Sequence, residues 1–376
     1  MRILLIIIIS FITGDATSQA LKTTFTFNKN LEISEFSKNS GFIFGSPQGV
    51  ISNSDGDIFV ADAKIGSIIV FNKKGEMINK IGRIGRGGGE FTKINSLTLL
   101  PGDKILIYDF FQKRFTTFSS EGNLINTKFS PKNAYMKPEK MRYIQDVGVV
   151  LFYRTLLGMR GQVKESDDYL IHIISDDFSE IKERLVPISE TIDITDNFEV
   201  EFEGGSLQGH FSVNDSTITL APYFFRGTIL QYSKKNNWEL DKMFDGYVET
   251  QKTYIPVEDP RDIIGKGYGT RSNRFGLLAG IMNNESLGMF QKQNGDYLHL
   301  GLLKIGKEQK LYVNLFDSEG TLKAHGPVTN LHPGLQKNEF YRRMRFYWMD
   351  EQDQLYVIDN AEDGFYVYRG TIKRKN

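Results

Sequence analysis

The chain of 376 residues contains no cysteine. This absence excludes disulfide bonds, thiolate metal sites, cysteine nucleophiles and a lipid anchor on an N-terminal cysteine. Lys and Arg together number 46, as do Asp and Glu, so the formal net charge is zero. Nucleic-acid binding depends on a surplus of basic residues, so no nucleic-acid partner is expected. Without disulfides the fold must rely on its apolar core, and a chain of this length can bury a sizeable one.

Catalytic and metal-binding patterns are scarce as well. The sequence has no Ser nucleophile elbow. No stretch keeps a 3.6-residue apolar period over three turns, so helices are not expected. No cofactor is therefore predicted and no catalytic residue is identified, although a Ca²⁺ or other metal site assembled from distant segments stays open. The five histidines lack the spacing of a metal-binding pair: His172, His210, His299, His325 and His332.

A single long apolar run lies at the N-terminus. Residues 3–12 (ILLIIIISFI) follow Met1 and Arg2 and precede a small–x–small exit at residues 18–20. This arrangement is typical of a secretory signal peptide, and the run is too short for a bilayer, which needs about 20 residues. We expect residues 1–20 to be removed and the protein to be exported to the periplasm, the cell surface or the medium. The alternative is a short buried strand. No transmembrane segment is expected in the mature chain, 21–376.

A repeated unit is the most informative feature. Two stretches repeat the same pattern of apolar and turn residues at a fixed offset. Each reads as short alternating strands joined by Gly, Asp and Asn turns. A repeat of about 40–50 residues with four strands is typical of a β-propeller blade. Four positions recur 47 residues later: Phe44, Asp62, Phe71 and Gly75 as Phe91, Asp109, Phe118 and Gly122.

The unit can be followed to the C-terminus, where Phe340, Asp359 and Tyr368 restore the pattern. Third strands are expected near residues 71, 118, 174, 232, 316 and 368, which predicts six blades in one domain. The step of 84 residues between the fourth and fifth strands leaves a seventh blade as the alternative. We interpret residues 245–285, rich in Gly, Asn, Asp and Pro, as a long loop instead.

The unit also predicts how the ring is held together. Phe44, Phe91 and Phe340 precede their blades at the same point, and we expect them to pack between successive blades. The last unit ends near residues 371–373. Its outermost strand is therefore expected from the N-terminal segment around Thr23–Phe27, so that the N- and C-terminal strands pair and close the ring.

These residues resemble the NHL-type and TolB-like six-bladed propellers, especially the exported versions common in Bacteroidota. The resemblance rests on GRGGGEF (85–91), ILIYD (105–109), RFTTF (114–118) and SEGNLI (120–125), and on their counterparts in the first unit. It covers residues 41–130 and 338–370. It implies the fold, and it implies function only as a class, since such propellers include lactonases, lyases and binding scaffolds.

The glycine-rich segment 82–89 is a candidate phosphate cradle. Such a cradle needs a following helix or a Lys-Ser/Thr pair, and neither is present. We interpret the segment as a flexible connection between blades. If it binds a ligand, Arg83 and Arg86 would offer guanidinium groups to a carboxylate or sulfate.

The recurring Asp62, Asp109 and Asp359 admit two interpretations. They could form a ring of calcium ligands or acids. We favour turn formers that bind nearby backbone amides, because these aspartates recur with the repeat whereas catalytic residues usually occur once.

Two further segments combine arginine with aromatic residues. The first, residues 338–348, includes Arg342 and Arg345 among aromatic residues that blade packing mostly explains. Such a combination could also bind a carbohydrate or a peptide. The second is the expected long loop with Tyr268, Arg271 and Arg274, and it is the preferred place for function because long loops often carry it.

The leading hypothesis is a monomeric, exported propeller that binds a protein, peptide or glycan and has no catalytic site. An alternative is a lactonase-like propeller hydrolase or lyase with a divalent cation in the central channel. A third is a scaffold within a cell-envelope assembly.

Overall fold

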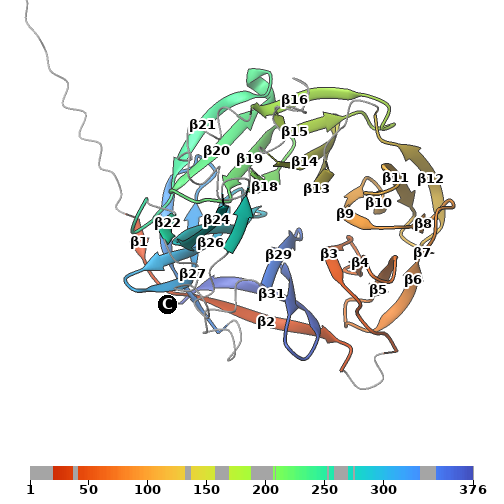
Figure 1. The fold of residues 1–376 in the computed structure, drawn as a ribbon, viewed down its shortest axis with the longest axis horizontal. Coiled ribbons are helices and arrows are strands. Elements are labelled where there is room, and N and C mark those ends of the chain that lie inside the picture. Colours follow the sequence, from red (N-terminus) through yellow and green to blue (C-terminus); the bar gives the residue numbers. More distant parts are fainter. Residues whose placement is uncertain are drawn as a thin grey trace, which may run out of the picture.

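The computed structural model places the strands of this chain in a ring (Figure 1). Residues 1–19, which hold most of the expected signal peptide, lie outside the described part. No helix among the described residues is long and apolar enough to cross a membrane. The structure describes residues 20–36, 41–131, 137–156, 169–187, 206–207, 209–251, 254–257, 270–273, 276–330 and 344–375.

Four-stranded antiparallel blades form the first half of the ring, and each begins with the strand nearest the central axis (Figure 1). Blade 1 consists of β3 (Pro47–Ser52), β4 (Ile58–Asp62), β5 (Ser67–Phe71) and β6 (Met77–Ile81). Blade 2 consists of β9 (Ile94–Leu100), β10 (Lys104–Asp109), β11 (Arg114–Phe118) and β12 (Leu124–Phe129). Blade 3 consists of β13 (Lys137–Ile144), β14 (Gly148–Leu156), β15 (Tyr169–Ile174) and β16 (Ile181–Pro187).

The second half repeats this arrangement. Blade 4 consists of β18 (Gly209–Val213), β19 (Thr217–Pro222), β20 (Thr228–Ser233) and β21 (Glu239–Asp245). Blade 5 consists of β25 (Asn284–Gln291), β26 (Tyr297–Ile305), β27 (Glu308–Phe316) and β28 (Leu322–Thr329). Blade 6 consists of β29 (Met344–Met349), β30 (Leu355–Asn360), β31 (Phe365–Arg374) and, outermost, the N-terminal β2 (Phe25–Ser34). The chain is therefore an all-β, six-bladed propeller, as predicted, and the third strands lie at the expected positions.

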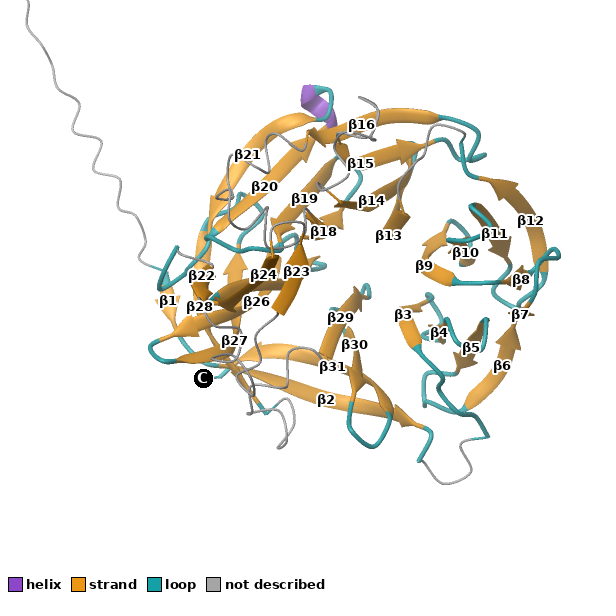
Figure 2. Cartoon of the chain, viewed as in Figure 1, coloured by secondary structure: helices purple, strands orange, loops and turns teal. Residues whose placement is uncertain are grey.

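A few short elements lie outside the blade strands, and Figure 2 shows how little of the described chain is helical. They are β1 (Leu21–Lys22), β7 (Arg83–Ile84) paired with β8 (Glu90–Phe91), β17 (Ser206–Leu207) and a 3₁₀ turn at Lys234–Asn236. The prediction of a long loop over residues 245–285 was wrong in part. A three-stranded sheet of β22 (Tyr254–Val257), β24 (Gly276–Met282) and β23 (Thr270–Asn273) lies there. Its strands, YIPV, GLLAGIM and TRSN, are short and do not alternate apolar with polar residues, which is the pattern that identifies a strand.

Pairing of the two chain ends closes the ring, as predicted. β2 runs antiparallel to β31 from Phe25 opposite Arg374 to Ser34 opposite Tyr366, well beyond the expected Thr23–Phe27. The start of β2 also pairs in parallel with β28, as does β1. The N-terminal segment thus joins the outer edges of blades 5 and 6 into one sheet.

The apolar core lies between the blades. Each of six buried clusters combines residues from two neighbouring blades, so every blade packs on both faces. Phe91 has no exposed surface and lies between blades 1 and 2, and Phe44 lies between blades 6 and 1. Both occupy the inter-blade position expected from the repeat. Phe340 lies outside the described residues.

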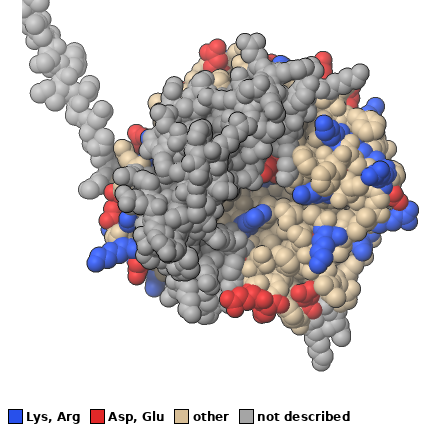
Figure 3. Space-filling view, viewed as in Figure 1, with Lys and Arg blue, Asp and Glu red and all other residues tan. Residues whose placement is uncertain are grey.

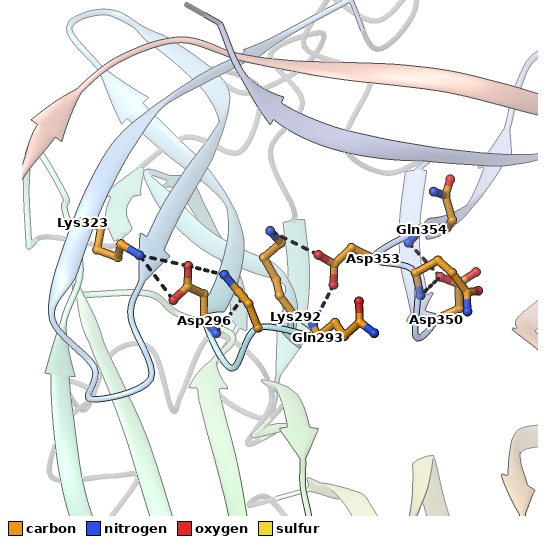
Figure 4. Close-up of polar contacts among 9 residues, drawn as sticks. Lys292, Gln293, Asp296, Lys323, Asp350, Asp353 and Gln354 are labelled. Carbon is orange, nitrogen blue, oxygen red and sulfur yellow. Dashed lines mark hydrogen bonds and ion pairs between the residues drawn. The ribbon is translucent and has the colours of Figure 1, made fainter.

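Polar contacts link the hairpin turns of neighbouring blades at one end of the ring. Asp353 in the β29–β30 turn accepts a hydrogen bond from the backbone N–H of Gln293 (2.8 Å) and pairs with Lys292 (3.2 Å), both in the β25–β26 turn (Figure 4). Asp103 in the β9–β10 turn accepts from Ser54 of blade 1 in the same way. Both aspartates have left-handed backbone, with φ of 58° and 56°. The turns therefore support one another around this end of the ring.

Candidate functional site

Basic side chains gather where the inner strands of blades 3 and 6 face each other across the ring. Lys140 and Arg142 lie two residues apart on β13, so they share one face of that strand. Arg345 and Tyr347 lie on β29, where a β-bulge at Tyr347 interrupts the alternation, and His210 lies on β18. In Figure 3 the face of the ring is hollowed near its centre, and basic side chains are visible beside the hollow and over blades 1 and 2. We call Lys140, Arg142, His210 and Arg345 the channel cluster.

Arg142 links opposite blades. One Nη of its guanidinium donates to the backbone carbonyl of Tyr347 (2.7 Å), and the other donates to the carbonyl of Met141 (2.8 Å). The guanidinium carbon lies 4.8 Å from the Trp348 ring centre and 6.0 Å from that of Phe211. Burial lowers the pKa of Arg142 to about 10, which still leaves it charged at neutral pH. A fixed positive charge therefore lies across the channel.

Lys140 lies beside this charge with its amine between two acceptors. Its Nζ donates to the carbonyl of Gly209 (2.6 Å) and contacts Nδ1 of His210 (3.0 Å). Burial lowers the pKa of Lys140 to about 7; Glu139 opposes the shift, and Arg142 and Arg345 add to it. Burial and the charge of Lys140 also hold the pKa of His210 well below its usual range. His210 is therefore neutral at neutral pH and accepts a hydrogen bond from the ammonium form of Lys140.

Arg345 completes the cluster from blade 6. The neighbouring Tyr347 raises the pKa of Arg345, with Glu139 adding to the effect. Burial raises the pKa of Tyr347 itself, against the influence of Arg345, so its hydroxyl stays neutral. The cluster thus combines cations with aromatic rings, and Glu139 is the carboxylate whose charge acts on both Lys140 and Arg345. Such a surface attracts anions and repels a divalent cation.

Metal ligation finds little support in the described part of the chain, which contains no group of three or more His, Cys, Asp or Glu side chains that could hold a metal ion. Two repeated aspartates bind the backbone instead. Asp62 accepts from the N–H groups of Gly45 (2.6 Å), Ser46 (2.9 Å) and Lys64 (3.0 Å). Asp109 in blade 2 accepts in the same way from the N–H of Thr92 (2.6 Å), at the entry of its own blade. These carboxylates act as turn formers: each joins the entry of its blade to the turn after the second strand of that blade.

A buried Ser–His–Asn chain has the composition of a catalytic triad but is oriented differently. Ser286 Oγ donates to the carbonyl of Pro222 (2.7 Å), so Nε2 of His299 (2.9 Å) must donate to that oxygen. Asn314 lies against Nδ1 of His299 (3.3 Å), and burial lowers the pKa of His299 to about 3. All three residues have no exposed surface. The Ser286 hydroxyl donates its proton to a backbone carbonyl, and no substrate can reach it. This hydrogen-bond network is therefore structural.

The glycine-rich segment forms a closed turn at the outer rim, where β7 and β8 lie (Figure 1). The Glu90 carboxylate accepts from the Gly87 N–H (2.8 Å) and pairs with Arg83 (2.7 Å). The buried Arg114 donates to the carbonyls of Arg86, Gly87 and Glu90. The N–H of Gly87 and the guanidinium of Arg83 thus serve an internal carboxylate, and Arg86 is exposed. The segment is an ordered connection between blades 1 and 2, where we expected a flexible one.

The sequence candidates are distributed unevenly over the structure. Arg345 lies in the channel, whereas Arg83 and Arg86 lie at the rim. Arg271 lies on β23, where only the backbone is described. Tyr268, Arg274 and Arg342 lie outside the described residues.

Lys140, Arg142 and His210 were not predicted as site residues. Their signal was available: the inner strands of blades 1 and 2, PQGVIS and INSLTLL, contain no charged residue, whereas that of blade 3 is KPEKMRYI.

Comparisons with known proteins agree with this architecture. A protein from Bacteroides fragilis that is described as exported has a TM-score of 0.57 at 12% identity, and the match covers 94% of this chain and 96% of the other. A DUF4221 family member from Bacteroides vulgatus has a TM-score of 0.55 at 8% identity, covering 94% and 100%. Virginiamycin B lyase from Staphylococcus aureus scores 0.45 at 11% identity, covering 92% and 99%. At these identities the likeness to the two Bacteroides proteins concerns the fold alone.

Two further comparisons concern the sequence. No curated protein matches the chain. A family model does: that of DUF5128, described as a 6-bladed beta-propeller, over residues 40–245. Since this match spans more than half of the chain, the protein belongs to the DUF5128 family of six-bladed β-propellers.

Proposed function

We propose that this protein is an exported binding module that recognises an acidic group of its ligand in the central channel. The observation that carries the proposal is Arg142, which extends from blade 3 to the Tyr347 carbonyl of blade 6 with Lys140 and Arg345 beside it. The cations on these strands repel one another at short range. Their mutual repulsion is relieved when an anion binds between them.

The chemistry of the channel cluster suits a carboxylate or a sulfate. An arginine has five N–H donors in a fixed fork, and the two contacts of Arg142 leave donors for a ligand. The partly accessible Tyr347 and Trp348 offer aromatic surface beside these donors. A peptide or glycan that carries acidic groups would satisfy both parts of the site.

The localisation of the protein is proposed on separate grounds. Residues 1–20 have the pattern of a signal peptide, and the similar Bacteroides fragilis protein is classed as exported. We propose that residues 21–376 form one monomeric propeller outside the cytoplasm. The NHL-type or TolB-like subtype remains a prediction. The lactonase-like alternative required carboxylates from several blades around a metal, whereas the described inner strands of blades 3 and 6 bring arginine and lysine together.

The test is titration calorimetry of the mature protein with four probes: a sulfated glycan, a polyuronate, a poly-glutamate peptide and neutral dextran. We expect binding of an acidic probe that weakens with added salt, and none of dextran. Arg142→Met and Arg345→Met should each weaken that binding about 10–100-fold, the effect of losing one hydrogen bond to a charged group.

The matched control is Lys80→Met, which removes an exposed charge from the outer strand β6. It should leave the affinity unchanged. Equal affinity of Arg142→Met, Arg345→Met and the unmodified protein for every acidic probe would refute the channel as the binding site. The probe that binds best would separate a peptide ligand from a glycan ligand.

A further inference from the structure

The amine of Lys140 has properties that simple anion binding does not need. We infer that Lys140 is a carbonyl-reactive amine, and that the channel captures an oxo acid, meaning an aldehyde or ketone that also carries a carboxylate. The carbonyl part of this inference stands on Lys140 and His210. The carboxylate part rests on the proposed function, because it assigns that group to the same arginines.

The position of the amine leaves it available to a reactant. Lys140 is half-buried, so part of the residue is exposed to solvent. Its Nζ makes two contacts, with the Gly209 carbonyl and His210 Nδ1. Among the described residues no carboxylate forms an ion pair with it. A lysine used only for structure would normally end at a carboxylate or in water.

The surroundings favour the neutral, nucleophilic form of the amine. Arg142 on its own strand and Arg345 on β29 are cations, and His210 on β18 is uncharged; Tyr347 stays protonated, and Glu139 is the opposing charge. Desolvation beside other cations is a general way to activate a lysine for imine formation. The low pKa of Lys140 agrees with this reasoning.

The chemical step balances without any additional reactant. The Nζ lone pair attacks the carbonyl carbon, a C–N bond forms, and one of the two Nζ protons moves to the carbonyl oxygen, which gives a carbinolamine. Nζ passes its second proton to Nδ1 of His210, 3.0 Å away. His210 then returns this proton to the hydroxyl of the carbinolamine. Water leaves as the C–O bond breaks, and a C=N bond to Lys140 remains.

The neighbouring arginines select the class of carbonyl compound. Residues i and i+2 of a strand lie about 7 Å apart. The Arg142 side chain therefore begins about that far from Lys140, on the same face of β13. A carboxylate held by Arg142 or Arg345 would bring an attached carbonyl to the amine. A neutral aldehyde has no carboxylate that these arginines could hold.

The experiment uses glyoxylate as the probe on the mature protein at pH 7, with cyanoborohydride to reduce any imine to carboxymethyl-lysine. Peptide mapping by mass spectrometry gives the rate at each lysine. An exposed lysine is neutral in only about one molecule in 2,500 at this pH, whereas Lys140 is neutral in about half. We expect labelling of Lys140 to be at least about tenfold faster than that of Lys74 or Lys80 on blade 1.

Two controls make the outcomes distinct. Propanal should label Lys140 more slowly than glyoxylate, and Arg142→Met should remove that difference. Lys140→Arg keeps the positive charge but has no amine that can form an imine, so it should lose the label.

Labelling of Lys140 no faster than of Lys80, with acidic-probe binding intact, would overturn this inference and leave the proposed function standing. Equal rates with propanal and glyoxylate would overturn the choice of an oxo acid.

Discussion

Phe91 provides the sharpest test of the inter-blade packing. Its side chain has no exposed surface, and it lies among apolar residues of blades 1 and 2, with its ring centre 6.1 Å from that of Phe118. A Cβ added at Gly82 would lie 2.6 Å from the Phe91 ring, so the backbone of the connecting segment approaches the ring closely. Removing the ring would leave a cavity that this close-packed surrounding cannot easily fill.

The expected cost of Phe91→Ala is about 3–5 kcal/mol in the free energy of unfolding, since it combines the lost transfer of the ring with the cavity. The assay is urea unfolding of the mature protein, followed by far-UV circular dichroism because that signal reports on all blades. The two tryptophans give a second signal: Trp238 lies in blade 4, away from Phe91, and Trp348 in blade 6 packs against the cluster that contains Phe91. Agreement of the two signals would show that the blades unfold together.

Phe129→Ala is the matched control, because Phe129 ends β12 of the same repeat with 76% of its surface exposed. It should change the unfolding free energy by less than about 0.5 kcal/mol. If Phe91→Ala lowers the free energy of unfolding by less than about 1 kcal/mol, with an unchanged m-value, the packing of Phe91 between blades 1 and 2 would be refuted. An equal loss for both variants would show that the aromatic composition of blade 2, and not the inter-blade position, sets the cost.

Two further predictions concern buried polar groups. His299 and His210 have pKa values below the unfolded value of about 6.5, so the unfolded state binds more protons below that pH. Stability should therefore fall as the pH drops from about 6.5 to 5, and His299→Gln should lessen this slope in urea melts; an unchanged slope would argue against a neutral, buried His299. Arg114→Met should lower the free energy of unfolding by about 2–3 kcal/mol, because three loop carbonyls lose their donor. Arg83→Met, with 80% of its side chain exposed, should change it little, and equal losses in the two variants would contradict the role of Arg114.

The repeat carried most of the fold prediction because propeller geometry recurs in sequence. Asp62 and Asp109 must meet the backbone amides of each blade entry, and Gly75 and Gly122 must take positive φ in each outer turn, here 83° and 92°. These demands repeat with the blade, so residue spacing reveals them. Closure was predictable for a related reason: the last unit is one strand short.

The channel cluster was hidden because it belongs to no repeat. Lys140 and Arg142 on β13 lie far along the chain from Arg345 on β29, and they meet only because blades 3 and 6 face each other. In the sequence, Arg345 is a candidate only because of its aromatic neighbours, and Arg83 and Arg86 only because of the glycines around them. The residues that the ring brings together could be recognised only after the blades were counted and ordered.

The pairing of β2 with β31 also has a consequence for the order of folding. Phe25 and Arg374 are neighbours in space although 349 residues separate them in the chain. Joining such distant ends carries a large loop-closure entropy, and contacts of this range form slowly. Blade 6 should therefore be the last to complete, after blades 1 to 5 have assembled from contiguous segments.

During that interval both β2 and β31 have open edges. An open strand edge pairs readily with any matching strand, including the same strand of another molecule. At high protein concentration the N-terminal strand of one chain could complete the last blade of another. The feature that makes the finished ring continuous is thus also the point at which two unfinished rings could join.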